Sequence, residues 1–224
     1  MCGRTSLFAP PSALRERFDA SVPERYRPRY NVAPTEPLEV LTADERDAIQ
    51  RFRWGLVPSW ADGDREGFIN ARAETAAEKP AFRDAWAERP CLVLSSGYYE
   101  WRDAGRGPTQ PYRIYREDDV AFAMAGLWEP SAADAAGATV TILTTEPSDA
   151  VAHVHDRMPV VLPRGAEAEW LAAGPDERRA YCRPYPGADL DAYPVSTRVN
   201  DPGNGSPSVV EPDDTEQTGL GEFG

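Results

Sequence analysis

The second residue of the chain is a cysteine, and a cysteine at an amino terminus offers chemistry that an internal one lacks. Removal of Met1, expected before so small a side chain, would leave a thiol and a free α-amine on adjacent carbons. The amine has a reference pKa of about 7.7 to 8.0, so a useful fraction is neutral near pH 7 and can attack an aldehyde. The thiol can then close a five-membered thiazolidine. The alternative is that Cys2 is only a small apolar residue at a frayed end.

Two neighbours of Cys2 favour the reactive interpretation. Gly3 lets a substrate approach the backbone closely. Arg4 offers a fork of donors for a phosphate or carboxylate and would favour the thiolate.

A polar cluster follows in "FINARAET", residues 68–75. Asn70, Arg72 and Glu74 alternate with small residues, and in an extended segment their side chains would share one face. An amide, a guanidinium and a carboxylate on one face suit the lining of a site. A solvated strand edge is the alternative.

The stretch "SGYYEWR", residues 96–102, places Glu100 among Tyr98, Tyr99 and Trp101. Aromatic walls tend to desolvate a carboxylate, which raises its pKa and fits it to transfer protons. The rings could also stack on unpaired bases. The alternative is a surface glutamate beside core aromatics.

Both histidines of the protein fall in "HVHDRMPVVL", residues 153–162. One of them could serve as an acid or base, and Arg157 could hold a phosphate. The spacing of His153 and His155 does not fit a metal-binding helix, and we expect one of the two to be structural. The three cysteines form no C-x-x-C pair, so we expect neither a metal nor a cofactor.

The elements that must position these residues are short. Prolines and glycines punctuate the chain, which favours strands joined by turns over a helical bundle. Helices are expected at 12–20, at 80–88, at the start of 147–162 and within 166–181. Strands are expected at 37–43, 48–60, 89–102, 110–116, 121–129 and 138–146. The prediction is an α+β domain over residues 1–200 with a largely antiparallel sheet or barrel, followed by a disordered tail from residue 201.

The charge is strongly negative: 37 acidic against 24 basic residues give a formal net charge of −13. That balance is unlike an ordinary nucleic-acid binder, but an acidic, lysine-poor surface is typical of adaptation to high salt, where repulsion is screened. Residues 1–31 are locally basic. Nothing resembles an export signal or a membrane span, so we expect a cytoplasmic, monomeric protein.

Taken in order, the motifs "MCGR", "YNVAPT", "RWGLVPSWA", "INARAET", "GYYEW", "AGLWE", "TILTTE" and "HDRMPVVL" closely resemble the SRAP family, named for SOS-response-associated peptidases. The resemblance runs from residue 1 to about 200. It implies an SRAP-type fold with a barrel-like β core flanked by short helices. It also implies binding of single-stranded DNA and shielding of abasic sites by covalent attachment through the amino-terminal cysteine, in repair near replication forks.

The resemblance assigns roles to individual residues. Cys2 matches the cross-linking nucleophile, Asn70 the residue that positions it and the sugar, Glu100 the residue that assists sugar opening, and His155 the active-site histidine. Arg72 and Arg157 match phosphate contacts. The full set expected to contact DNA is Gly3, Arg4, Asn31, Pro34, Trp54, Trp60, Arg72, Arg83, Trp101, Thr144 and Arg157.

Two other functions stay open. An amino-terminal-nucleophile amidohydrolase or peptidase would also begin "MCG", and a peptidase activity could be limited to self-removal of an amino-terminal extension. A non-covalent DNA and clamp adaptor is the second. The tail segment 217–223 reads Q-x-x-L-x-x-F, which resembles a motif that binds the sliding clamp PCNA, with Gln217, Leu220 and Phe223 as its contacts.

Overall fold

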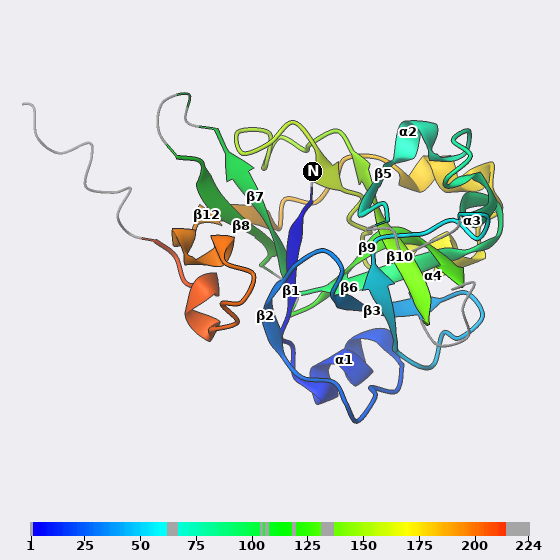
Figure 1. Cartoon of the computed structure of the whole chain (residues 1–224), viewed down its shortest axis with the longest axis horizontal. Helices are drawn as coiled ribbons and strands as arrows, with labels where there is room; N and C mark the ends of the chain where they lie inside the picture. Colours follow the sequence, from blue (N-terminus) through cyan, green and yellow to red (C-terminus); the bar gives the residue numbers. More distant parts are fainter. Residues whose placement is uncertain are drawn as a thin grey trace, which may run out of the picture.

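The computed structural model describes residues 2–61, 67–103, 105, 108–117, 120–130 and 137–213. Two β-sheets lie side by side, and short helices lie around them (Figure 1). The predicted α+β class with a largely antiparallel, barrel-like core is confirmed.

Five strands form a closed barrel. The pairing runs from β10 to β4, β3, β6 and β9 and returns to β10. Within this ring only β4 and β10 are parallel. The strands are β3 (Pro37–Thr42), β4 (Gln50–Trp54), β6 (Pro90–Ser95), β9 (Phe122–Pro130) and β10 (Ala138–Thr145).

Two very short strands extend the barrel along β10. Strand β5 (Asn70–Arg72) pairs with β10 in parallel, and β11 (Met158–Pro159) pairs with it in antiparallel orientation. The segments around Asn70 and just before Met158 therefore meet at one end of the barrel, although 88 positions of sequence separate the two residues.

The second sheet has five antiparallel strands in the order β12-β8-β7-β1-β2. Gly97 links it to the barrel, because β6 continues into β7 through this region. Its φ of +153° and the 2.9 Å that would separate a Cβ from the Ile114 carbonyl exclude other residues there. The strands are β1 (Arg4–Leu7), β2 (Arg29–Val32), β7 (Gly97–Arg102), β8 (Gln110–Arg116) and β12 (Leu190–Pro194).

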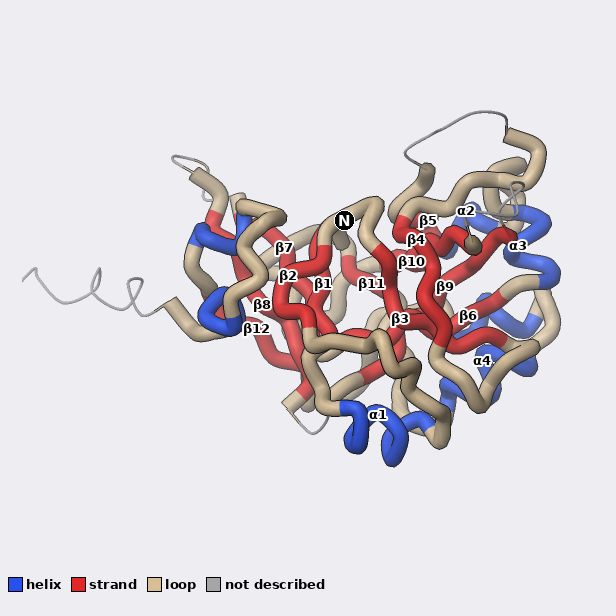
Figure 2. Tube along the Cα trace, turned by 60° about the horizontal axis from the view of Figure 1, so that its bottom comes forward, coloured by secondary structure: helices blue, strands red, loops and turns tan. Residues whose placement is uncertain are grey.

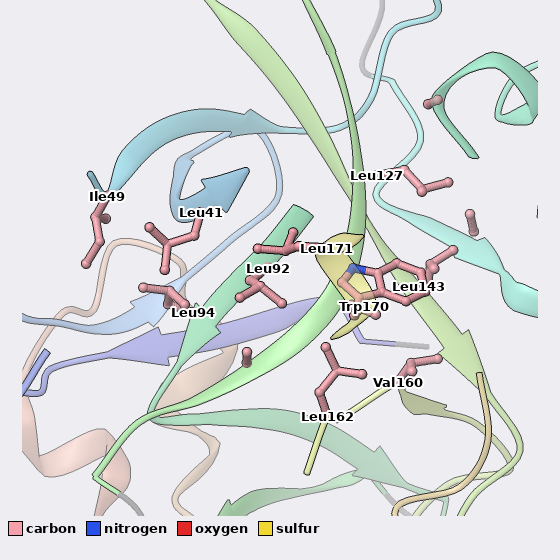
Figure 3. Close-up of a cluster of buried hydrophobic side chains, with 14 of the residues drawn as sticks. Leu41, Ile49, Leu92, Leu94, Leu127, Leu143, Val160, Leu162, Trp170 and Leu171 are labelled. Carbon is pink, nitrogen blue, oxygen red and sulfur yellow. The ribbon is translucent and has the colours of Figure 1, made fainter. Parts of the chain in front are cut away.

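The helices cover one face of the barrel strands. Helices α1 (Pro11–Phe18), α3 (Arg83–Glu88) and α4 (Ala166–Ala172) each contribute buried side chains to a cluster that includes leucines of β3, β6 and β9. Figure 3 shows Trp170 and Leu171 of α4 against these leucines. Alternate strand residues form a second cluster, which also contains Cys2, Trp54 and Tyr98.

The carboxyl-terminal segment, residues 195–213, corrects a prediction. Its polar, Gly- and Pro-rich composition predicts disorder from residue 201, yet the segment packs against the second sheet through η2 (Thr197–Asn200) and η3 (Pro207–Val210) (Figures 1 and 2). Val199 and Val209 are buried there beside Tyr99. A few apolar side chains at the right spacing suffice to dock an otherwise polar segment.

Two local predictions also need correction. The segment 68–75 is not extended throughout, because β5 ends at Arg72 and α2 (Ala73–Ala76) begins directly after it. The helix expected at the start of 147–162 is instead a series of turns over 149–154. Within the predicted range 166–181, α4 and the 3-10 helix η1 (Glu177–Tyr181) form, with residues 173–176 between them.

Candidate active site

Cys2 lies just before β1 and is fully buried. Its thiol makes a long contact of 3.8 Å with the Arg4 carbonyl oxygen. Burial raises the pKa of the thiol well above its usual range, and the negative charge of Glu100 raises it further. The sulfur is therefore held as a protonated thiol, which does not behave as a pre-formed thiolate nucleophile.

Asn70 holds the backbone of Cys2. Its side-chain amide donates a 2.7 Å hydrogen bond to the Cys2 carbonyl oxygen. Ile69, the residue before Asn70, is also held in place, because the indole N–H of Trp54 donates a 2.9 Å hydrogen bond to its carbonyl oxygen. The amide oxygen of Asn70 is buried and finds no hydrogen-bond partner in the described part of the chain, so it is available to a donor from a ligand.

Glu100 lies on β7 and is only 3% exposed. Burial raises the pKa of its carboxyl to about 7, the positive charge of the chain's amino terminus opposes this rise, and the charge of Asp156 adds to it. A carboxyl with a pKa near neutrality can both donate and accept a proton at pH 7.

His155 lies in the turn that leads into β11. Burial lowers the pKa of its imidazole, and the positive charge of the amino terminus lowers it further. The backbone N–H of Arg157 donates to Nδ1 at 3.0 Å, so the neutral ring carries its proton on Nε2. The exposed Asp156 carboxylate lies 2.8 Å from the same Nδ1 and can accept from it when the ring is protonated.

The structure thus brings together the four residues predicted to be catalytic. The hydrogen bond joins Asn70 to Cys2, and charge interactions join Glu100 to Cys2 and to Asp156, which follows His155 in the same turn. They come from four separate segments of the chain. The arrangement offers a thiol, a backbone-positioning amide, a carboxyl whose pKa is about 7 and an imidazole whose pKa is lowered.

Arg157 forms an ion pair with Glu74. Its guanidinium donates two hydrogen bonds to the Glu74 carboxylate, at 2.7 and 2.9 Å, and one to the Thr144 carbonyl at 2.7 Å. This contact lowers the pKa of Glu74. The buried Thr144 serves as a support for Arg157, whereas Arg72 at the end of β5 is exposed.

Arg4 and Asn31, both expected at DNA, are buried under the carboxyl-terminal segment instead. Arg4 donates to the Asn31 side chain at 2.8 Å and to the Val199 carbonyl at 2.6 Å. Asn31 in turn donates to the carbonyls of Val199, Asp201 and Asn204 at 3.0 to 3.2 Å. Trp101 faces the same segment and donates to Asn200 at 2.7 Å. These hydrogen bonds hold both side chains against the carboxyl-terminal segment, and the expected DNA contacts of Arg4 and Asn31 stay predictions.

The two tryptophans of "RWGLVPSWA" have opposite environments. Trp54 is completely buried in the cluster that contains Cys2, and its direct contact with DNA stays a prediction. Trp60 is 61% exposed. A small pocket of about 130 Å³ lies beside it, lined by Val57, Pro58, Trp60, Ala61, Gly67 and Phe68.

The remaining predicted contacts are scattered. Gly3 and Pro34 are half-buried, and His153 is exposed with its ring 5.9 Å from that of Tyr112. Arg83 lies on the exposed side of α3 and pairs with Asp84 at 3.3 Å. The clamp-binding residues Gln217, Leu220 and Phe223 lie outside the described residues.

Sequence reasoning missed two groups at the site. One is the Trp54 indole N–H, which acts through the Ile69 carbonyl, and the other is the hydroxyl of Tyr98, which is buried in the same cluster as Cys2. Only the position of Tyr98 two residues before Glu100 in "GYYEW" could have indicated it.

A model of the family described as SOS response associated peptidase (SRAP) matches residues 1–202. The chain belongs to the SRAP family. SRAP relatives include the abasic site processing protein YoqW of Bacillus subtilis, 38% identical over 94% of this chain and 99% of the relative. The abasic site processing protein HMCES of Gallus gallus is 32% identical over 95% of this chain and 78% of the relative.

Solved structures agree with this SRAP assignment. A crystal structure of a protein from Bacteroides thetaiotaomicron superposes with a TM-score of 0.83 at 27% identity and covers 95% of this chain and 100% of that chain. One from Bordetella bronchiseptica gives 0.75 at 27% identity and covers 87% and 100%.

Within the described SRAP residues, no group of three or more His, Cys, Asp or Glu side chains is placed to hold a metal ion. Among the described helices, none combines the length and apolar character that a membrane crossing needs.

Proposed function

We propose that this protein binds single-stranded DNA at abasic sites and shields them by forming a covalent thiazolidine through Cys2 after removal of Met1. The observation that carries the proposal is the 2.7 Å hydrogen bond from Asn70 to the Cys2 carbonyl, which fixes Cys2 close to the charge of Glu100. The names of the relatives YoqW and HMCES, abasic site processing proteins, support the choice of substrate.

The first step is opening of the sugar. An abasic deoxyribose is mostly a closed hemiacetal, so its ring oxygen must gain a proton while the C1′ hydroxyl loses one. Glu100, with its pKa near 7, can donate the first proton and accept the second. The products are a C1′ aldehyde and a free C4′ hydroxyl.

The second step joins the protein to the sugar. The lone pair of the Cys2 amine adds to C1′, and water leaves as the iminium forms. The thiol then gives up its proton, its sulfur adds to C1′, and the iminium electrons return to nitrogen. The net reaction is aldehyde plus aminothiol to thiazolidine plus water, and it removes the aldehyde that would otherwise promote strand cleavage by β-elimination.

The state of the Cys2 thiol favours this order over hydrolysis. Burial keeps the thiol protonated, so an amidohydrolase or peptidase would have to use the α-amine of Cys2 as the base that activates it. The amine is therefore the better first nucleophile. His155, in its imidazolium form, which the lowered pKa makes the minor form near pH 7, is the group we assign to protonating the ring during release. Any peptidase activity would be limited to removal of residues before Cys2.

The test is adduct formation with a single-stranded oligonucleotide that carries one abasic site, in concentrated KCl. We expect a heat-stable adduct on a denaturing gel and an intact mass that places it on the Cys2 peptide. Cys2→Ala should abolish it, and Cys182→Ala, which removes a half-buried thiol elsewhere, should not. A strand with a tetrahydrofuran in place of the sugar lacks the aldehyde and should stay free. No adduct with Met1 shown to be absent would overturn the covalent proposal in favour of a non-covalent adaptor.

We also propose that the segment 217–223 tethers the protein to the sliding clamp PCNA. Its support is the Q-x-x-L-x-x-F pattern alone, in which Gly224 stands where a second aromatic is usual. We expect Leu220→Ala with Phe223→Ala to weaken binding to purified PCNA in a titration. Unchanged affinity in the double variant would refute the tether. The proposed cross-linking does not depend on it.

A further inference from the structure

Tyr98 lies in the same side-chain cluster as Cys2, and the mechanism proposed above gives its hydroxyl no role. The residue lies on β7 and is 1% exposed, and its Oη has no hydrogen-bond partner among the residues that the structure describes. An unpaired buried hydroxyl costs free energy, so native proteins retain few of them without a purpose. Either this hydroxyl is a tolerated defect or its partner forms only during the reaction.

The orientation of Tyr98 favours the second explanation. It packs in the cluster that contains Cys2, whereas its neighbour Tyr99 packs against Val195 and Val199 on the other side of β7. Alternation along the strand places Tyr98 and Glu100 on the same face. Tyr99 is satisfied, since its hydroxyl donates to the Tyr30 carbonyl at 2.6 Å.

The electrostatic environment keeps Tyr98 protonated. Burial raises the pKa of its phenol well above the usual value, and the charges of Glu100 and Cys2 both raise it further. Tyr98 is therefore a neutral O–H donor near pH 7. A group that cannot lose its proton there is suited to stabilising negative charge rather than to transferring protons.

We propose that the Tyr98 hydroxyl donates a hydrogen bond to the sulfur of Cys2 as the thiazolidine closes. This inference rests on the proposed function for its biological setting. In the resting protein the thiol makes only a long contact, 3.8 Å from its sulfur to the Arg4 carbonyl oxygen, within the part of the chain that the structure describes. When the thiol proton leaves and the sulfur lone pair attacks the iminium carbon, the sulfur becomes a charged acceptor. No bond of Tyr98 breaks.

The chain supplies a matched control for the test. Tyr98→Phe and Tyr99→Phe each remove one hydroxyl from adjacent buried tyrosines on opposite faces of β7. Both variants, with Met1 removal confirmed by mass, are mixed with glycolaldehyde, a small aldehyde that needs no DNA site. Cyanoborohydride traps the open iminium as a secondary amine with a free thiol, whereas the closed ring consumes the thiol. Mass and thiol titration therefore separate the two steps.

We expect Tyr98→Phe to form the iminium at the wild-type rate but to close it about tenfold more slowly, because it lacks a hydrogen bond to a charged group. Trapped amine should accumulate in this variant and not in Tyr99→Phe. Thermal unfolding should show a melting temperature for Tyr98→Phe equal to or above that of the wild type, since the removed hydroxyl had no partner to lose.

Equal closure rates in Tyr98→Phe and the wild type would overturn the inference, as would slower closure that accompanies a lower melting temperature. The wild type could also close the ring with glycolaldehyde yet form no adduct with abasic DNA. That result would refute the proposed function while leaving the comparison of Tyr98 and Tyr99 decisive.

Discussion

The side chain of Asn70 donates a hydrogen bond to the backbone carbonyl of Cys2 across 68 positions of sequence. It constrains the segment that carries the proposed nucleophile without contacting the sulfur. We expect Asn70→Ala to slow adduct formation with abasic single-stranded DNA about tenfold, because a single neutral hydrogen bond contributes about 0.5–1.5 kcal/mol. Single-turnover gels measure the rate. Asn204→Ala, at a distant asparagine, is the control, and an unchanged rate in Asn70→Ala would contradict a positioning role.

The buried carboxyl of Glu100 should make stability depend on pH. Its pKa is raised to about 7 from an ordinary value near 4.5, so the folded state holds a proton that the unfolded chain has lost between these values. Stability from this group is therefore greatest below pH 4.5 and falls as pH rises through 7, by about 3 kcal/mol in all. Glu100→Gln should remove that fall.

Urea unfolding of wild type and variant at pH 5 and pH 8 checks this. Relative to the wild type, Glu100→Gln should gain stability at pH 8. Glu88→Gln, at an exposed position, should show no such change. A Glu100→Gln effect of the same size at both pH values would show that the carboxyl does not titrate in this range.

Substitution of Trp54 should affect the stability of the protein, whereas substitution of Trp60 should affect its DNA binding. Trp54→Ala empties a fully buried site and should lower the free energy of unfolding by about 3–5 kcal/mol. Trp60→Ala, at an exposed position, should change stability by less than about 0.5 kcal/mol but weaken single-stranded DNA binding by about 1–3 kcal/mol through lost base stacking. Fluorescence anisotropy and urea unfolding measure the two quantities. Wild-type affinity in Trp60→Ala would remove Trp60 from the interface.

The Glu74–Arg157 ion pair should limit binding of DNA. Glu74→Gln removes a carboxylate that accepts two hydrogen bonds from Arg157 and leaves Arg72 exposed nearby on the chain. We expect tighter single-stranded DNA binding and a salt dependence steeper by about 0.7 for each additional phosphate that the protein neutralises. Titrations at several KCl concentrations give the slope, with Glu88→Gln as the control. Weaker binding would mean that Glu74 holds Arg157 in its DNA-binding orientation.

Substitution of Asn31 should lower the stability of the protein rather than its affinity for DNA. Its side chain donates to three carbonyls of the carboxyl-terminal segment and accepts from Arg4. Asn31→Ala should lower the free energy of unfolding by about 2–3 kcal/mol. Asn204→Ala loses two exposed side-chain hydrogen bonds, to the Arg198 carbonyl at 3.3 Å and from the Ser206 N–H at 3.2 Å, and should cost about 1 kcal/mol. A loss of DNA affinity in Asn31→Ala without loss of stability would instead support the predicted DNA contact.

The sequence by itself predicted the five barrel strands, β7, β8 and the chemical types at the site, but not β1, β2 or β12. Strand β8 falls on the predicted range 110–116, because its alternation and flanking turns are local signals. The desolvation of Glu100 was equally foreseeable, since its aromatic neighbours are adjacent in the chain. The interpretation of Cys2 as a reactive residue likewise follows from its place next to Met1 and from Gly3 and Arg4 after it.

Tertiary structure alone decided which of these residues meet. The parallel pairing of β5 with β10 brings Asn70 to Cys2, and no local pattern encodes that register. Trp54 and Trp60 share one motif, yet one is buried and the other exposed, because packing depends on distant strands. The docking of residues 195–213 likewise turns Arg4 inward. Local spacing fixes the chemistry that each segment can offer, whereas non-local burial and strand pairing determine which groups are placed together and which are used to hold the fold.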